Sequence, residues 1–143
     1  MRSGFILVAL LLAAAGCAAQ RQVHESAHMQ TGNSGVCAAF AGGQSHVEVV
    51  ARGNVTRILG TRAGRSGSHE GYLVRLDSGC DLVVKVETNV TLTGPVPLHT
   101  GEPVIVKGEY EFYSLGGVIH WTHRDPEGRH EGGYVQAGGS TFQ

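Results

Sequence analysis

The chain has 143 residues, among them eight histidines, three cysteines and 22 glycines, and its formal net charge at pH 7 is −1. This length has room for one domain and a short appendage. The slightly acidic balance argues against binding to nucleic acid through phosphate contacts, and the sequence has neither a basic amphipathic helix nor a highly charged tail.

The first residues have the layout of a secretory signal. Arg2 supplies a positive charge, and residues 5–15 form an apolar run that is too short to span a bilayer as a permanent helix. The run ends in Ala14-Ala15-Gly16-Cys17, which resembles the lipobox of bacterial lipoproteins, in which the Cys is lipidated and becomes the new N-terminus. Ala14 stands where the lipobox usually has Leu, and ordinary cleavage near Ala18-Ala19 is the alternative.

These features predict where the protein resides. We expect residues 1–16 to be a lipoprotein signal peptide and Cys17 to carry the lipid, so that the protein is exported and anchored to a membrane. Ala18 after the Cys resembles lipoproteins of the outer membrane, so we expect an anchor there, with the protein facing the periplasm. Residues 17–45 are polar, small and aperiodic, which predicts a flexible tether, and one turn of helix around Cys37 is compatible with it.

The two remaining cysteines, Cys37 and Cys80, are candidates for a disulfide, because the expected compartment permits one. By chain-entropy reasoning a bridge across this separation stabilises a fold by roughly 3–4 kcal/mol. Two separate buried thiols are the alternative. A metal site built on this pair is disfavoured, because neither Cys has a second Cys at close spacing.

Beyond the tether, apolar residues alternate with polar ones, which predicts half-buried strands. The first strand begins near residue 47, with a bend or bulge at Gly53, and a loop rich in Gly, Ser and Arg is expected over residues 60–68. Further strands are expected over residues 72–76, 82–92, 104–112 and 118–123, with a possible short last one at 134–136.

Five regularly spaced strands and no long helix predict an all-β domain over residues 46–143. A closed or nearly closed sheet removes the exposed edges that invite aggregation. We therefore predict a small five-stranded antiparallel OB-like barrel. The missing helix between the third and fourth strands argues against a full OB topology, and a two-sheet sandwich is the alternative.

The last third of the chain carries a specific string. It runs Gly108-Glu109-Tyr110-Glu111-Phe112, then GGVIHWTH over residues 116–123, then Asp125-Pro126, Gly128 and His130. This string resembles that of a bacterial family of small exported proteins, the domain of unknown function 3465, and the resemblance covers residues 47–143.

Two positions depart from the family pattern. His69-Glu70 stands in place of a His-Gln pair, and Thr88-Asn89 stands in place of His-Asn. A site that relies on the second histidine of that pattern is therefore incomplete in this chain. The resemblance implies a small exported protein, and it implies no mechanism, because the family has no established activity.

One group of residues is a candidate metal or polar cluster: His69, His120, His123, Asp125 and His130. Imidazoles suit zinc, copper or nickel, and an open coordination position could activate water. Residues three apart on a regular strand point to opposite faces, so two of these histidines can share an ion only if the strand bulges or ends near Thr122. The alternative is that the carboxylate and the imidazoles bond to one another and to the loop backbone, fixing a tight corner.

A second group contains candidate ligand contacts: Arg57, Arg62, Arg65, Asn89, Glu109 and Trp121. The three arginines flank the first loop, where OB-like barrels commonly take ligands, and could hold an anion. Trp121 is expected to be a core residue, with a stacking platform for a ligand as the alternative. Glu109 and Glu111 alternate with apolar residues, so we expect both on a solvated face, with a general-acid pair as the alternative.

The sequence contains no nucleophile elbow, phosphate loop, HExxH helix or paired CxxC. Our leading hypothesis is a non-catalytic binding module in the periplasm that recognises a small ligand, an envelope polymer or a partner protein. One alternative is a metal-dependent, phosphodiesterase-like hydrolase that uses the His/Asp cluster and a divalent transition metal such as zinc. A structural envelope protein is the other.

Overall fold

The computed structural model describes residues 32–143. The predicted signal peptide and the predicted lipidation site, Cys17, lie outside the described residues. Within the described part, no helix is long and apolar enough to cross a membrane. In chain order the elements are α1 (Ser34–Ala41), β1 (Val47–Gly64), β2 (Gly67–Leu76), β3 (Val83–Asn89), α2 (Val90–Thr93), β4 (Pro103–Glu111), β5 (Val118–His120), β6 (Tyr134–Ala137) and β7 (Ser140–Phe142).

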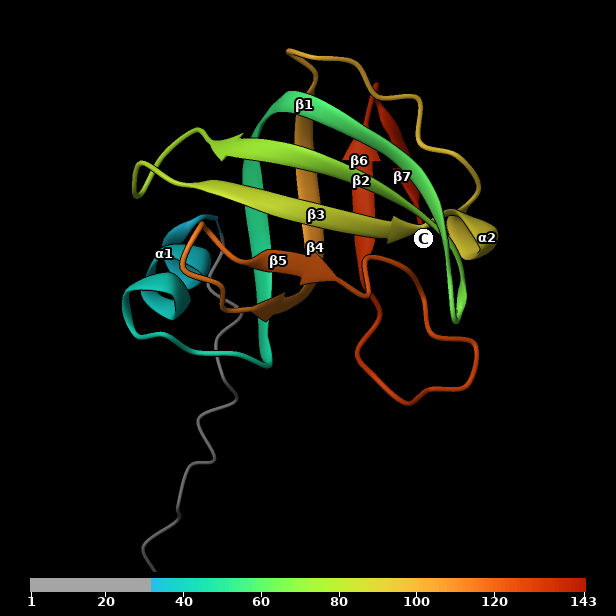
Figure 1. Cartoon of the computed structure of the whole chain (residues 1–143), viewed down its shortest axis with the longest axis horizontal. Helices are drawn as coiled ribbons and strands as arrows, with labels where there is room; N and C mark the ends of the chain where they lie inside the picture. The colour runs from blue at the N-terminus through green and yellow to red at the C-terminus, as the bar shows by residue number, and fades with distance from the viewer. Residues whose placement is uncertain (1–31) are drawn as a thin grey trace, which may run out of the picture.

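The strands form one sheet in which five of them make a ring of pairings (Figure 1). The order is β1-β2-β3-β5-β4, and β4 pairs with β1 again. The strands β6 and β7 extend the sheet from β4, where β6 occupies the part of the β4 edge that the short β5 leaves free. The described chain is therefore mostly β, as predicted.

The prediction that every pairing would be antiparallel was wrong, because β3 and β5 run parallel. The other pairings of the ring are antiparallel. The reason is geometric: an odd number of strands cannot alternate in direction all the way around a ring, so at least one neighbouring pair must run the same way. That pair is where β5, the shortest strand of the ring, meets β3.

β1 is longer than predicted, and the predicted loop over residues 60–68 was wrong. β1 and β2 remain paired as far as Gly64 and Gly67, which leaves only a two-residue turn. Two register shifts between Val55 and Gly60 bend β1, so that its first half pairs with β4 and its second half with β2 alone. Small and polar residues extend this hairpin because strand pairing uses backbone groups and does not require an apolar side chain.

The predicted alternation of buried and exposed residues is confirmed across the ring. The inward-facing residues of β1 to β4 form one hydrophobic core, into which Ile119 of β5 also packs. The buried residues that follow this alternation are Val49, Ala51, Val55, Tyr72, Val74, Leu76, Val84, Val86, Val104, Val106 and Tyr110.

The predicted tether of residues 17–45 contains helix α1, which packs on the sheet. Val36 and Ala39 are buried in the core. The Asn33 side chain accepts a hydrogen bond from the Arg52 backbone N–H (2.7 Å), and its amide group donates to the Arg52 carbonyl oxygen (2.9 Å). The folded part of the chain therefore begins before residue 46. An eight-residue helix of small residues gave little periodic signal from which to predict it.

Cys37 of α1 and Cys80 of the β2–β3 turn form a disulfide that spans 43 positions. We expect the Cys80→Ser variant, or reduction of the wild type, to lower the free energy of unfolding by roughly 3–4 kcal/mol, because the bridge restricts the unfolded chain. Denaturant unfolding with and without reductant measures this. Equal stability of the oxidised and reduced proteins would contradict it.

Gly53 lies where β1 is paired with both β2 and β4, and a Cβ atom there would overlap the carbonyl oxygen of Arg75. We expect Gly53→Ala to lower the free energy of unfolding by about 1–3 kcal/mol, since the backbone must shift to admit the methyl group. Gly71→Ala in β2 is the matched control, because its added Cβ would meet nothing nearer than 3.5 Å. Thermal unfolding of both variants tests this, and equal melting temperatures would contradict it.

Candidate functional site

A cleft of about 520 Å³ opens between the tip of the β1–β2 hairpin, the ends of β2 and β3, α2, and the segment that follows β5. We call it the histidine cleft. Its wall includes all five residues of the predicted metal or polar cluster, which are His69, His120, His123, Asp125 and His130. The sequence therefore identified a set of side chains that the fold does bring to one place.

The backbone at Trp121 explains how these residues come together. β5 ends at His120, and Trp121 has a φ of +52°, in the left-handed region that bulky residues rarely adopt. Because the strand stops there, His123 no longer follows the strand alternation, and it lines the same cleft as His120. The condition that the strand end near Thr122 is thus met two residues earlier, at His120.

The expectation that Trp121 belongs to the core was wrong. Its surface is 37% exposed, and the residue lines the histidine cleft. The indole stacks on the His130 ring, with centroids 4.5 Å apart and planes 14° apart, and the His120 ring lies 4.9 Å away. Trp121 therefore presents an aromatic wall to the cleft, which matches the alternative of a stacking platform.

Two histidines of the cleft are oriented by the loop backbone. His123 Nδ1 donates to the carbonyl oxygen of Arg124 (2.9 Å), and His130 Nδ1 donates to that of Glu131 (2.8 Å). The His123 and His130 rings meet edge to face at 5.1 Å. These bonds leave His123 Nε2 without a partner among the described residues, whereas His130 Nε2 lies 3.9 Å from Asp125 Oδ2.

The donor atoms of the predicted metal cluster do not converge on a single ion. Among residues 32–143, the one group of three or more His, Cys, Asp or Glu donors within 4.8 Å of one another is His46, Glu109 and Glu111, outside the cleft. Asp125, the predicted carboxylate ligand, instead accepts backbone N–H bonds from Glu127, Arg129 and His130. The alternative of a carboxylate that fixes a tight corner describes Asp125 better.

The bonds to Asp125 change its acidity. The N–H groups of Glu127, Arg129 and His130 stabilise the carboxylate and lower the pKa of Asp125 from 3.8 to about 2. The charged form therefore orders the loop at all but strongly acidic pH.

Asn89, a predicted ligand contact, lines the cleft but is buried and bonded within the protein. Its Oδ1 accepts the Thr91 N–H (3.1 Å) and caps α2, and its Nδ2 donates to the Ser66 carbonyl oxygen (2.9 Å). Asn89 thus ties the tip of the β1–β2 hairpin to α2 and holds one rim of the cleft.

The predicted arginine contacts lie outside the cleft. Arg57, Arg62 and Arg65 are exposed, and none of them lines it. Their loop became a paired hairpin, which distributes their side chains along β1 and its turn. Arg62 pairs with His69, a residue of the cleft, across the hairpin.

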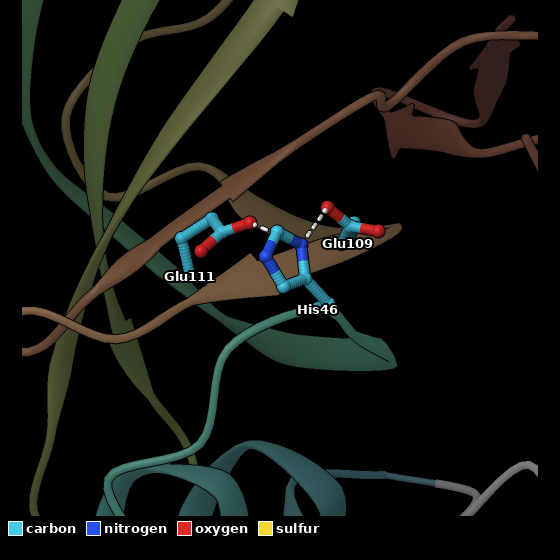
Figure 2. A group of neighbouring side chains, drawn as sticks. All are labelled: His46, Glu109 and Glu111. Atoms are coloured by element: carbon cyan, nitrogen blue, oxygen red, sulfur yellow. Dashed lines mark hydrogen bonds and ion pairs between the residues drawn. The ribbon is translucent and has the colours of Figure 1, made fainter.

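The expectation of a solvated face for Glu109 and Glu111 was also wrong. Their side chains are only 13% and 22% exposed, because His46 lies across them (Figure 2). His46 Nδ1 is 2.8 Å from Glu111 Oε1 and 3.2 Å from Glu109 Oε1. The hydrogen bond that His46 donates to Glu109 and the charge of Glu111 raise the pKa of His46 above its usual value.

Several residues of these sites were absent from the sequence-based candidates, among them Glu87 and His46. Glu87 of β3 lines the cleft, and hydrogen bonding from Lys85 lowers its pKa. His46 lies 63 positions before Glu109, and only the pairing of Val47 with Tyr110 brings it there. Neither residue belongs to a local motif, so each could be placed only from strand pairing: that of β1 with β4 for His46, and that of β2 with β3 for Glu87.

Comparison with known proteins gives one result. The profile of the family described as "Protein of unknown function (DUF3465)" matches residues 20–143. No curated protein and no solved structure matches the chain.

The bonds to Asp125 give a pH prediction. Because its pKa is lowered by folding, its stabilising effect is complete above about pH 4 and is lost as the pH falls through about 2. We expect acid to loosen the loop over this range in the wild type, and Asp125→Asn to remove that pH dependence. Emission from Trp121, the single tryptophan, reports the change. Glu127→Gln, an exposed position in the same loop, is the control, and an unchanged pH profile in Asp125→Asn would contradict the assignment.

Proposed function

We propose, from the premise that the chain belongs to the DUF3465 family, that this protein is a binding module. In this proposal Cys17 is lipidated, the protein is anchored to the outer membrane facing the periplasm, and the described domain is an OB-like barrel. The histidine cleft binds a small polar ligand that has one flat face, such as a sugar ring of an envelope polymer.

The strand order supports the OB-like barrel. An OB fold is a five-stranded Greek-key barrel. The ring β1-β2-β3-β5-β4 closes on β1, and a short helix, α2, follows β3 before β4 begins. The sequence had lacked a signal for that helix, which is only four residues long.

The position of the cleft is the observation that carries the proposal. OB folds bind ligands on the face of strands 2 and 3 and at the loop between strands 1 and 2. The histidine cleft is lined by Ser66 of that loop, His69 of β2 and Glu87 of β3. A shared fold does not fix the ligand, so the side chains that line the cleft supply the chemistry.

The lining predicts the kind of ligand. Trp121 and Leu92 are exposed and apolar, so they can cover a flat face of a small molecule. The Nε2 atom of His123 can bond to a hydroxyl group, and the Glu87 carboxylate can accept a hydrogen bond. One apolar wall facing a few convergent polar groups is the usual composition of a small-molecule site.

The hydrolase alternative receives less support. Its proposed carboxylate, Asp125, is bonded to three backbone N–H groups, and the donors of its cluster lie too far apart to share an ion. The same side chains can contact a small ligand in the positions that they already occupy.

A fluorescence titration tests the proposal. Trp121 is the single tryptophan, so its emission reports directly on the cleft. Neutral sugars, amino sugars and soluble peptidoglycan fragments are each added to the full chain. We expect at least one of these probes to shift the emission of Trp121 in a saturable way. His130→Gln should weaken such binding about tenfold, or ~1.4 kcal/mol, by removing a stacked ring and a polar contact.

The control is Leu115→Ala, which changes an exposed apolar residue outside the cleft and should leave the affinity unchanged. The proposal fails if no probe shifts the emission, or if His130→Gln binds as tightly as the wild type.

A further inference from the structure

Beside the histidine cleft, on the outer face of β4 and β5, four side chains meet that the proposed function does not use as a group. They are His46, Glu109, Glu111 and His120, which we call the two-glutamate cluster (Figure 2 shows the first three). Glu109 and Glu111 are two apart on β4 and share a face, and Glu109 pairs with His120 across the β4–β5 ladder. The turn before β1 brings His46 over them.

This cluster differs from an ordinary exposed ion pair because two carboxylates converge on the same point. Both are mostly covered, and their like charges repel each other in that setting. The one strong contact of each carboxylate in the cluster is with the same atom, His46 Nδ1. One divalent cation at this point would balance both negative charges.

His120 supplies an independent observation. Its Nε2 atom is buried and has no hydrogen-bond partner among the described residues. It lies 3.5 Å from Glu109 Oε1 and 3.8 Å from Glu111 Oε1, on the same carboxylate atoms that contact His46. Buried polar atoms normally have a partner, so an orphaned nitrogen aimed at two carboxylates indicates a missing ligand.

The distances between donors fit a metal ion. Donors at about 2.0–2.2 Å from a tetrahedral zinc lie roughly 3.3–3.6 Å from one another. In the two-glutamate cluster the four nitrogen–oxygen distances run from 2.8 to 3.8 Å and so bracket this value. The donor atoms of His46, Glu109 and Glu111 all lie within 4.8 Å of one another, and the His120 ring must move toward His46 to join them on one ion. Two imidazoles and two carboxylates also form a donor set that zinc accepts.

We propose that His46, Glu109, Glu111 and His120 bind one divalent transition-metal ion of the zinc type. The ion balances the paired carboxylates and completes the bonding of the His120 ring. His46 is 76% exposed, which gives the ion a path from solvent. Because His120 also lines the histidine cleft, the ion fixes one wall of that cleft without occupying it.

The backbone agrees with this assignment. Two non-glycine residues of the described chain have positive φ, His46 at +60° and Trp121 at +52°. One is a proposed ligand, and the other directly follows a proposed ligand. Such conformations persist where the surroundings hold them in place, and bound metal would do so at both positions.

Zinc itself is the probe that tests the proposal. The full chain, freed of metal by chelation, is titrated with zinc in a calorimeter. We expect one zinc ion per chain, and we expect His46→Asn and Glu111→Gln each to weaken the affinity by at least about tenfold, as the loss of a ligand requires. Asn tolerates the positive φ of His46, and Gln keeps the shape of Glu111, so both variants should fold.

Two sets of controls make the result specific. His99→Asn removes a comparable His–Glu pair elsewhere: His99 Nδ1 is 2.8 Å from Glu102 Oε2, and the His99 side chain is 74% exposed. This variant should bind zinc as tightly as the wild type. His123→Asn and His130→Asn, in the cleft, should also retain zinc.

Either of two outcomes would overturn the proposal. One is a wild type that takes up no stoichiometric zinc. The other is zinc binding that survives in His46→Asn and Glu111→Gln, whether or not it is lost from the cleft variants. Binding of sugar probes is measured separately, so failure of the metal site leaves the proposed function standing.

Discussion

Closure of the five-strand ring is the constraint on which the rest of the structure depends. β1 must pair with β2 on one side and β4 on the other, so it is long and is bent by register shifts. At Gly53 the backbone of Arg75 lies so close that a side chain would not fit. Closing an odd number of strands requires a parallel pair, and β5 provides it against β3. β5 is short and ends at His120, and both the cleft and the two-glutamate cluster are built where it stops.

The sequence predicted the parts of the fold that arise from local patterns. Alternation along β1, β2 and β4 located the core, because a strand with one buried face must repeat every second residue. The histidines near the end of β5 were identified as a group, since they are close in sequence and the Asp125-Pro126 turn marked the end of a strand.

What the sequence did not predict depends on register and on packing between distant segments. His46 meets Glu111 only through the β1–β4 pairing. The burial of α1 depends on the disulfide and on Asn33, while the small residues of the helix carry almost no periodic signal. Trp121 was assigned to the core from strand alternation, a rule that no longer applies once the backbone turns at that residue.

One consequence concerns how the domain presents its cleft. β2 begins at Gly67, beside the cleft, and ends at Leu76, near the turn whose Cys80 is bridged to α1 (Figure 1). Ten residues of strand span about 30 Å, so the helix where the described chain begins and the ligand-sized opening lie at opposite ends of one continuous strand. If the domain is attached to a surface through its N-terminal side, this opening therefore faces away from that surface, toward molecules in solution.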